Sequence, residues 1–261
     1  MRAVTLLGVL LVVGCRSSSA VDAGPPKKPL PKLEPLEQVK AELSPDASID
    51  EREAIFRVVP IDLVGPPAPG QAVRLELDGE SVKQGGAPFD LATVKQDDDV
   101  ILVPIGDTYL VQIAPVLAAL DDVGADVFLQ HPDKPIAWPI DLRDEAVFQT
   151  WIDDPEPGKV RVIQRADGFE LQTNLGKLPG QDPNGPTVPV RGGQLDLKTL
   201  QRGLDKVAQF FRTKDVCFVP SFGTEVAQIS RALASNWKSA EVAFFPTQCL
   251  VYPRPKPKPA P

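Results

Sequence analysis

The sequence is poor in the residues that metal binding and catalysis usually need. It contains one histidine, His131, and three cysteines among 261 residues. A single histidine with no second histidine or cysteine nearby makes a poor metal site, so we interpret His131 as structural or exposed. No phosphate-binding loop, dinucleotide fingerprint or nucleophile elbow is found. We therefore expect a protein that is not an enzyme, uses no cofactor and has no catalytic or metal-binding residues.

Aromatic residues and positive charge are also scarce. The chain has 11 Phe, 3 Trp and 2 Tyr, so its core must be mostly aliphatic. Its 28 Lys and Arg against 35 Asp and Glu give a formal net charge of -7. A nucleic-acid-binding protein needs a basic face to neutralise phosphates, so we expect no nucleic acid among the partners.

The acidic runs and glycine pairs favour structural roles. The runs at 97–99 and 121–122 lack the alternating oxygen-ligand spacing of a calcium loop, and we interpret them as solvated loops or helix ends. The Gly-Gly pairs at 85–86 and 192–193 could hold an anion near a helix start. An acidic residue follows each pair within a few positions, so plain turns are the favoured interpretation.

Long apolar runs are missing except at the N-terminus. The run Val4–Val13 is too short to span a bilayer, which needs about 20 apolar residues, but it has the length of a signal-peptide core. The following "VVGC" (12–15) resembles the lipobox of bacterial lipoproteins, in which the cysteine is lipidated and becomes the first mature residue. The resemblance implies a signal peptide at 1–14 and lipidation of Cys15. The alternative is an ordinary signal peptide that contains a cysteine.

Two stretches of the chain nearly repeat each other 116 residues apart, "DVILVPIGDTYLVQIA" at 99–114 and "DVCFVPSFGTEVAQIS" at 215–230. Preserved order over a long spacing predicts two copies of one domain rather than a short-period repeat. Further matches in the same order pair 56–59 with 160–163, 75–77 with 169–171, 85–96 with 192–202, and 125–129 with 240–244.

The second copy predicts the unit most clearly. Period-two alternation on both sides of Asp167-Gly168 predicts a hairpin. Apolar residues at helical spacing predict a helix over 197–211, capped by Asp196. "DVCFVP" is typical of a strand buried on both faces. We expect a second helix from a cap at Thr224 to Trp237, then a final strand at 240–245. The unit is thus β-β-α-β-α-β, two helices packed on a small mixed sheet.

The first copy is expected to be degenerate, because residues 90–99 allow only a turn or two in place of the first helix. Each unit resembles the periplasmic domain of the ExbD/TolR family, whose members share this order of elements. The predicted fold class is α+β, with two tandem ExbD/TolR-like units. The boundaries are a lipidated Pro-rich tether at 15–50, the first copy at 51–137, a linker at 138–158, the second copy at 159–251, and a Pro/Lys-rich tail at 252–261.

The chain differs from members of the ExbD/TolR family at its N-terminus, and this difference affects the function that we expect. Members carry an N-terminal transmembrane helix with a proton-carrying carboxylate, and here the lipidated Cys15 stands in its place, so that carboxylate has no counterpart. The resemblance implies a non-enzymatic envelope lipoprotein that acts as an accessory, scaffold or binding component of biopolymer transport or envelope maintenance. Because Arg16 is not Asp, the lipobox resemblance implies an outer-membrane position facing the periplasm.

The expected partners are the membrane, through the lipid anchor, and envelope proteins or peptidoglycan; a homodimer is left open. We expect the partner surface on the exposed face of the helix at 197–211 or at an open sheet edge. The alternative function is a ligand-binding or enzymatic module that uses the groove between the two copies.

The remaining cysteines and the tryptophans are expected to be structural. Cys217 corresponds in the repeat to Ile101, so a packed core position is predicted. An oxidising compartment would permit a disulfide with Cys249, but the sequence does not show whether the two approach, so a disulfide and two buried thiols stay open. Trp138 and Trp151 are expected to pack the linker between the copies.

Overall fold

The computed structural model describes residues 58–59, 64–155, 158–211 and 213–255. The expected signal peptide and tether, including Cys15, lie outside this part of the chain, as does 256–261 of the expected tail. All described residues belong to one compact unit. Among the described helices, none combines the length and the apolar character that crossing a membrane requires.

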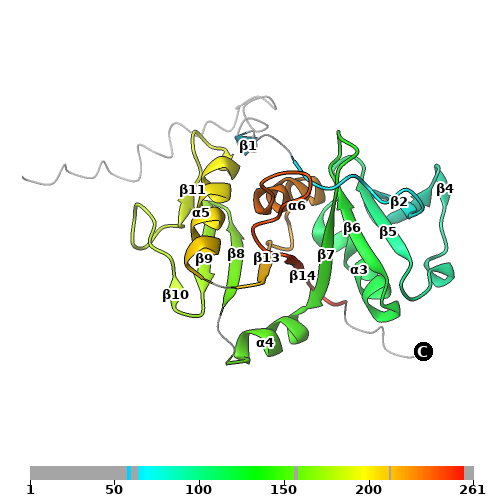
Figure 1. Ribbon diagram of the computed structural model, residues 1–261. Coiled ribbons are helices and arrows are strands. Elements are labelled where there is room, and N and C mark those ends of the chain that lie inside the picture. Colours follow the sequence, from blue (N-terminus) through cyan, green and yellow to red (C-terminus); the bar gives the residue numbers. More distant parts are fainter. Residues whose placement is uncertain (1–57, 60–63, 156–157, 212, 256–261) are drawn as a thin grey trace, which may run out of the picture. The chain divides into compact units, whose positions relative to one another are not determined.

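The described residues form an α+β fold built on one mixed sheet of 12 strands (Figure 1). A separate parallel pair joins β1 (Val58–Val59) to β12 (Leu195–Asp196). The order in the large sheet is β10 (Gly176–Lys177), β9 (Gly168–Thr173), β8 (Lys159–Arg165), β13 (Asp215–Val219), β14 (Thr247–Tyr252), β7 (Ala137–Asp144), β6 (Asp126–Gln130), β5 (Asp99–Pro104), β2 (Val73–Asp78), β3 (Ser81–Gln84) and β4 (Ala87–Pro88), with β11 (Val188–Pro189) paired to β9.

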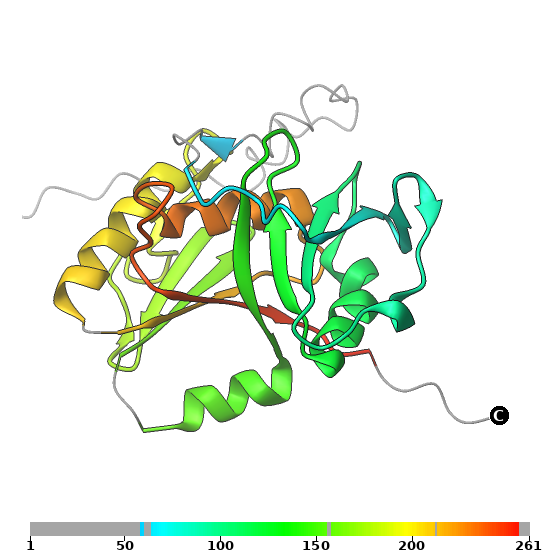
Figure 2. The same cartoon turned by 45° about the vertical axis from the view of Figure 1, so that its right-hand side comes forward.

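Helices cover both faces of this sheet. They are α3 (Leu110–Val123), α4 (Glu145–Asp153), α5 (Leu197–Phe210) and α6 (Val226–Leu233), with 3₁₀ turns at Leu91–Thr93 and Ala234–Asn236. Successive side chains of a strand point to opposite faces. In β13, Val216 and Phe218 join the large core that contains the apolar residues of α3, α5 and α6, whereas Cys217 joins a small cluster under α4. Figure 2 accordingly shows α4 on the opposite side of the sheet from α5 and α6.

The strand pairings on the two sides of β7 correspond. In the first half, β2 forms a hairpin with β3 and pairs in parallel with β5, which pairs in parallel with β6. In the second half, β8 forms a hairpin with β9 and pairs in parallel with β13, which pairs in parallel with β14. β7 lies between the halves, antiparallel to β6 and parallel to β14. Read outward from β7, the order of these four strands is therefore the same in both directions.

The halves share one sheet, in place of the small sheet expected for each. The segment expected as a linker supplies the strand that joins them, because β7 pairs with β6 through its first residues and with β14 through its last ones. Trp138 of β7 is fully buried in a core that takes Leu117 from the first half and Leu233 from the second. By pairing on both sides, β7 removes the open edges that β6 and β14 would otherwise present.

The expectation for the last strand is wrong. Residues 240–245 are irregular, and the final strand is β14, at Thr247–Tyr252. The apolar side chains of the irregular segment anchor it, since Phe245 is fully buried and its backbone N–H and carbonyl both bond to the Asn236 side chain, each at 3.0 Å. The helix expected to reach Trp237 ends at Leu233, although the Trp237 side chain still packs in the core.

Two of the expected repeat matches are also wrong. The pairing register joins Val73 of β2 to Val100, and Val160 of β8 to Val216. Since Val100 and Val216 are an identical pair of the repeat, β2 corresponds to β8, and the match of 75–77 with 169–171 in β9 fails. β1, which was matched to β8, pairs with β12 outside the large sheet.

Several local expectations are confirmed. β8 and β9 form the hairpin at Asp167-Gly168. The Asp196 side chain caps α5 by accepting the Thr199 N–H at 2.9 Å. The first helix is reduced to the turn Leu91–Thr93, and all four glycines of the two Gly-Gly pairs have positive φ, as turns at these positions require.

Candidate functional site

The loop between β5 and α3 meets the loop between β13 and α6. Tyr109 and Glu225 form an isolated antiparallel bridge. On either side of them, the Leu110 N–H donates to the Thr224 carbonyl at 2.9 Å, and the Val226 N–H donates to the Thr108 carbonyl at 2.8 Å. The contacts are reciprocal in the repeat, because Tyr109 pairs with its own counterpart Glu225, and the two hydrogen bonds join counterparts in opposite order. We call this region, 105–111 and 221–226, the loop junction.

In the first half, the loop is closed onto the β2–β3 hairpin. The Ile105 N–H donates to the Leu77 carbonyl at 2.8 Å. The Thr108 hydroxyl accepts the Gly79 N–H at 3.0 Å and lies 3.0 Å from the Leu77 carbonyl and 2.8 Å from the Ile105 carbonyl, which share its one proton. Thr108 is 1% exposed. This buried hydroxyl ties the loop to the turn of the hairpin.

In the second half, the corresponding closure does not form. The Thr224 hydroxyl lies 2.9 Å from that of Ser221, and neither residue bonds to the β8–β9 hairpin in the part of the chain described. The pairing of β8 with β13 ends at Ile163 and Val219, one pair earlier than the pairing of β2 with β5. The second loop therefore stands away from its hairpin.

A groove of about 440 Å³ lies between the second loop and its hairpin, and we call it the junction groove. Its volume lies in the range of small-ligand sites, about 300–1,000 Å³. Residues of both halves line it, since the second loop contacts the first. They include Tyr109 from the first half and Arg165, Ala166, Leu195, Gly223 and Glu225 from the second.

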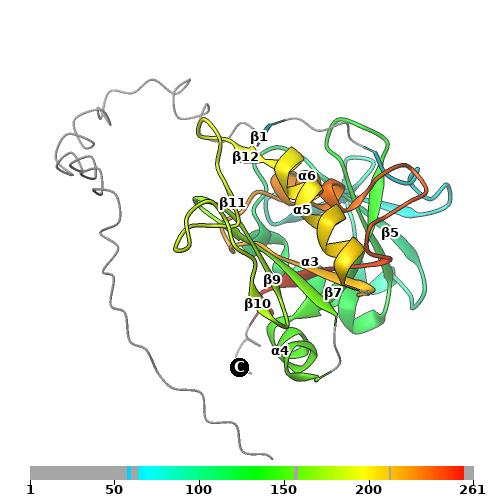
Figure 3. The ribbon, with the colours of Figure 1, turned by 60° about the vertical axis from the view of Figure 1, so that its left-hand side comes forward.

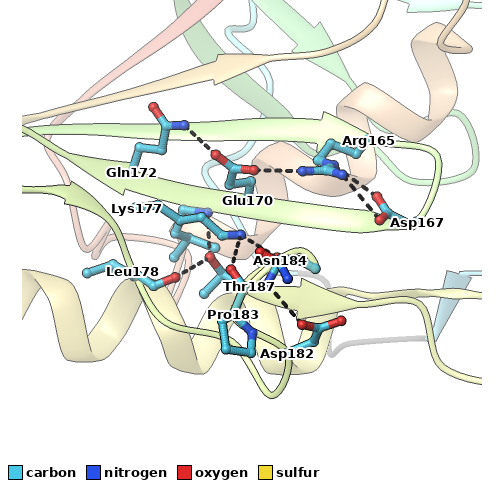
Figure 4. A network of polar contacts seen from close by, with 12 residues as sticks. Arg165, Asp167, Glu170, Gln172, Lys177, Leu178, Asp182, Pro183, Asn184 and Thr187 are labelled. Carbon is cyan, nitrogen blue, oxygen red and sulfur yellow. Dashed lines mark hydrogen bonds and ion pairs between the residues drawn. The ribbon is translucent and has the colours of Figure 1, made fainter.

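Arg165, the cationic residue that lines the groove, is already paired with two carboxylates. Arg165 lies at the β8–β9 turn, with its Nε 3.0 Å from Oδ1 of Asp167 and its Nη1 2.9 Å from Oε2 of Glu170 (Figure 4). The Glu170 carboxylate also accepts a hydrogen bond from Gln172. That bond, together with the one from Arg165, holds the pKa of the Glu170 carboxyl below its usual range. A bound anion would have to compete with two carboxylates for Arg165.

A polar network holds the segment that precedes β11. Val190, the residue directly after β11, lines the groove. The Lys177 ammonium donates to the carbonyls of Pro183 and Gly185 (Figure 4). The Thr187 hydroxyl donates to the Leu178 carbonyl at 2.9 Å and accepts a backbone N–H of β9 at 3.1 Å. This wall of the groove is therefore held by several bonds and needs no ligand to order it.

An apolar surface borders the groove at the loop junction. Four large apolar side chains there are between 36% and 55% exposed, and we call them the apolar rim: Ile105, Tyr109, Val111 and Phe222. The backbones of Val111 and Phe222 are adjacent, because the Val111 N–H donates to the Phe222 carbonyl at 3.1 Å. Single exposed apolar residues are ordinary, but a contiguous group of them marks an interaction surface.

The polar side chains of the groove do not form a recognisable catalytic set. Glu225 accepts a hydrogen bond from Gln228 at 3.3 Å, and the groove contains the Ser221 and Thr224 hydroxyls but no histidine. Across the described residues, His, Cys, Asp and Glu nowhere gather in a group of three that could hold a metal ion.

His131 lies away from the groove and is buried. It is 3% exposed, its Nδ1 accepts the Asp133 N–H at 3.0 Å, and its ring meets Trp138 edge to face. Burial lowers the pKa of this imidazole. The structure thus favours the structural interpretation of His131 and contradicts the exposed one.

Cys217 and Cys249 are joined by a disulfide. The sequence had left open whether they form a disulfide or two buried thiols. They face each other in register on β13 and β14, with their Cα atoms 4.5 Å apart. Phe148 and Trp151 of α4 cover them, and the Arg143 guanidinium lies 5.1 Å from the Trp151 ring centre. Ile101, the repeat counterpart of Cys217, is also fully buried. The disulfide lies on the opposite face from the core and belongs to no cavity described here.

A second cavity, of about 580 Å³, lies where β6 and β14 begin and is lined by Asp121, Asp126 and Asp141. Two of these acids have partners in the fold. Asp141 is 2.6 Å from Arg143, and Asp121 accepts the Tyr252 hydroxyl at 2.7 Å. Burial raises the pKa of Asp121 even so. This cavity is larger than the junction groove, but two of its three acids are engaged in contacts within the fold.

Part of the expected tail belongs to this second region, which corrects the boundary at 252. Tyr252 is the last residue of β14 and is fully buried. Arg254 follows with Nε 2.9 Å from Asp144 and Nη2 2.7 Å from Asp122. The Pro/Lys-rich composition of the segment gave no sign that Tyr252 and Arg254 would contact the fold.

Sequence reasoning allowed for a groove between the two copies but did not place it at these loops. The identical pair Thr108 and Thr224 marked both loops as equivalent, but the difference between "IGD" at 105–107 and "SFG" at 221–223 carried no visible consequence. The chain matches no protein-family model, and comparisons with curated proteins and with solved structures found no match.

Proposed function

We propose that the chain is a non-enzymatic, lipid-anchored protein of the bacterial envelope that binds a partner protein at the loop junction. The observation that carries the proposal is the open groove of the second half, at the place where Thr108 closes the first half. The apolar rim beside it is the kind of exposed surface that partner proteins cover.

We also propose that the two halves are tandem copies of one ExbD/TolR-like unit. The matching strand order and the reciprocal hydrogen bonds of Leu110 and Val226 support the duplication. The second copy keeps the full order of elements, whereas the first has lost a helix. A sheet shared by both halves differs from a pair of separate family domains, so the binding proposal rests on the groove rather than on the kinship.

An envelope location follows from the proposed lipidation of Cys15. The Cys217–Cys249 disulfide supports it, because disulfides persist mainly in oxidising compartments outside the cytoplasm. In this proposal the protein faces the periplasm from the outer membrane and serves biopolymer transport or envelope maintenance as an accessory, scaffold or binding component. Replacing Cys15 with serine should release it from the membrane fraction, and mass spectrometry of the mature N-terminus should show the lipid.

A photo-crosslinking amino acid in place of Tyr109 tests the binding proposal. Tyr109 belongs to both the groove and the rim and is 36% exposed. The same amino acid in place of Val147, which is 50% exposed on α4, is the control. We expect illumination of intact cells to give a discrete protein adduct from position 109 and none from 147. An adduct of twice the chain's own mass would identify a homodimer, and an adduct with peptidoglycan would replace the protein partner by that polymer.

A groove-filling substitution tests the same site without a crosslinker. A Cβ added at Gly223 meets no atom within 4 Å, and its φ is not positive, so Gly223→Trp fills the groove without backbone strain. Gly70 is equally open, and Gly70→Trp is the matched control. We expect Gly223→Trp to abolish the adduct from position 109 and Gly70→Trp to leave it intact. If both variants keep the adduct, the groove is not the binding site.

The size of the groove favours a second candidate, a small ligand or substrate bound between the halves. A small ligand would raise the melting temperature of the wild type and of Gly70→Trp but not that of Gly223→Trp. That result, combined with no protein adduct at position 109, would select this candidate over partner binding.

A further inference from the structure

We propose that the exposed face of α5, together with two apolar tips at one end of the sheet, docks onto an anionic lipid bilayer. This surface is separate from the junction groove. It would orient the folded part of the protein on the membrane, whereas a lipid at Cys15 only retains the chain there.

The exposed face of α5 carries a stripe of cations. Lys198, Arg202 and Lys206 recur every four residues, so they lie on one side of the helix within roughly 80° of arc. All three are exposed, and none forms an ion pair or hydrogen bond with any residue in the described ranges. Figure 3 shows α5 at the front of the view. Asp205 is the helix's one acid, at the edge of the stripe.

This stripe does not stabilise the helix. Like charges four residues apart repel each other and destabilise a helix slightly. The stability of α5 comes instead from its opposite side, where Leu200, Leu204 and Val207 are buried in the core. Unpaired cations gathered on one face of a chain with a net charge of -7 point to an anionic partner for that face.

Two apolar tips lie at one end of the same half. Phe210, the last residue of α5, is 82% exposed, and Leu175, in the β9–β10 turn, is 79% exposed. The register joins Asp215, which begins β13 just after α5, to Lys159, and Val160 to Thr173. The end of α5 and the β9–β10 turn therefore lie at the same end of the sheet.

A bilayer accounts for both features, which an acidic protein would not do as simply. Phe and Leu side chains that protrude into solvent gain free energy by entering the headgroup region, and Lys and Arg next to them contact anionic headgroups. Lys214 is exposed at this end as well. Each such cation near an anionic surface raises the docked population about fivefold.

Docking in this orientation leaves the junction groove accessible. The groove involves the loop that follows the C-terminal end of β13, whereas the tips lie near the strand's start. The partner-binding region would face away from the bilayer.

The lipidated full chain in vesicles with brominated lipids tests the proposal. In the variant Phe210→Trp the added indole is quenched only if the tip enters the bilayer. Val147→Trp, on α4 at the opposite face of the sheet, is the control. We expect Phe210→Trp to be quenched in vesicles that contain anionic lipid and not in zwitterionic ones. Quenching should weaken with salt, because screening acts over about 10 Å at 0.1 M. Val147→Trp should stay unquenched in both.

Charge variants in the Phe210→Trp background supply the second measurement. Replacing Arg202 and Lys206 with glutamine should lower the ratio of docked to undocked protein about 25-fold. Replacing Lys95 and Lys134, two exposed cations of the first half, makes the same charge change and should have little effect. If Phe210→Trp is unquenched on anionic vesicles at low salt, or if both tryptophan variants are quenched equally, the proposal is overturned. An acidic protein would then be the expected partner of the cationic face of α5.

Discussion

Replacing Thr108 with valine, and Thr224 with valine in a second variant, tests the difference between the two loops. Valine has the shape of threonine without its hydroxyl, so the change removes hydrogen bonds and little packing. If the first loop is closed by its threonine and the second stands open, the same chemical change at equivalent positions should have unequal costs.

The contacts allow both costs to be worked out. The buried Thr108 hydroxyl accepts the Gly79 N–H and donates to one of two carbonyls, those of Leu77 and Ile105. Each lost bond costs about 0.5–1.5 kcal/mol, and a buried group left without a partner costs about 1–3 kcal/mol, so Thr108→Val should destabilise the fold by about 2–3 kcal/mol. Among the residues that the structure describes, the Thr224 hydroxyl bonds only to Ser221, and Thr224→Val should cost about 0.5–1 kcal/mol.

Urea unfolding followed by tryptophan fluorescence measures both free energies, since Trp138 and Trp237 lie in the shared core. The conservative variant Thr108→Ser retains the hydroxyl and should recover most of the loss. Equal destabilisation by the two valine variants, or a larger effect at Thr224, would refute the argument that the second loop has lost its closure.

Three other predictions concern stability. Replacing Cys217 and Cys249 with alanine should cost about 3.5 kcal/mol in urea unfolding, because the bond closes a loop with a sequence separation of 32; a cost near zero would contradict this. Burial lowers the pKa of His131, so the unfolded chain binds the proton more readily, and unfolding free energy should fall as pH drops below about 6.5. The variant His131→Asn should lose that part of the pH dependence, and an unchanged profile would assign it to other groups. Asn236→Ala should cost about 2–4 kcal/mol in thermal or urea unfolding, because both backbone bonds to Phe245 are lost; an Asn236→Ala variant as stable as the wild type would show that this segment does not depend on them.

The parts of the fold that depend on local pattern could be predicted from the sequence. The helix at α5 was expected within one residue of its observed end, because Leu200, Leu204 and Val207 repeat at helical spacing after the Asp196 cap. β14 was missed for a reason that lies outside its own residues. The segment at 240–245 is as apolar as a strand, but Asn236 satisfies the backbone of Phe245, and that contact comes from the tertiary structure.

The candidate site was less predictable than the fold. The approach of Cys217 to Cys249 depends on the neighbouring placement of β13 and β14, which no pattern within either strand encodes. The junction groove arises because Thr224 lacks the bonds that its counterpart Thr108 makes. Identity of the two residues in the sequence concealed this difference, since the same side chain closes one loop and not the other.

The position of β7 has a consequence for how this architecture can change. Because the strand is bonded to both halves, deleting either one would leave a long line of unpaired backbone groups along the other. We therefore expect neither half to fold alone as an independent module. If the halves are tandem copies, as proposed above, they diverge inside a single folding unit, where one half can lose a helix or open a loop while its neighbour keeps the whole molecule intact.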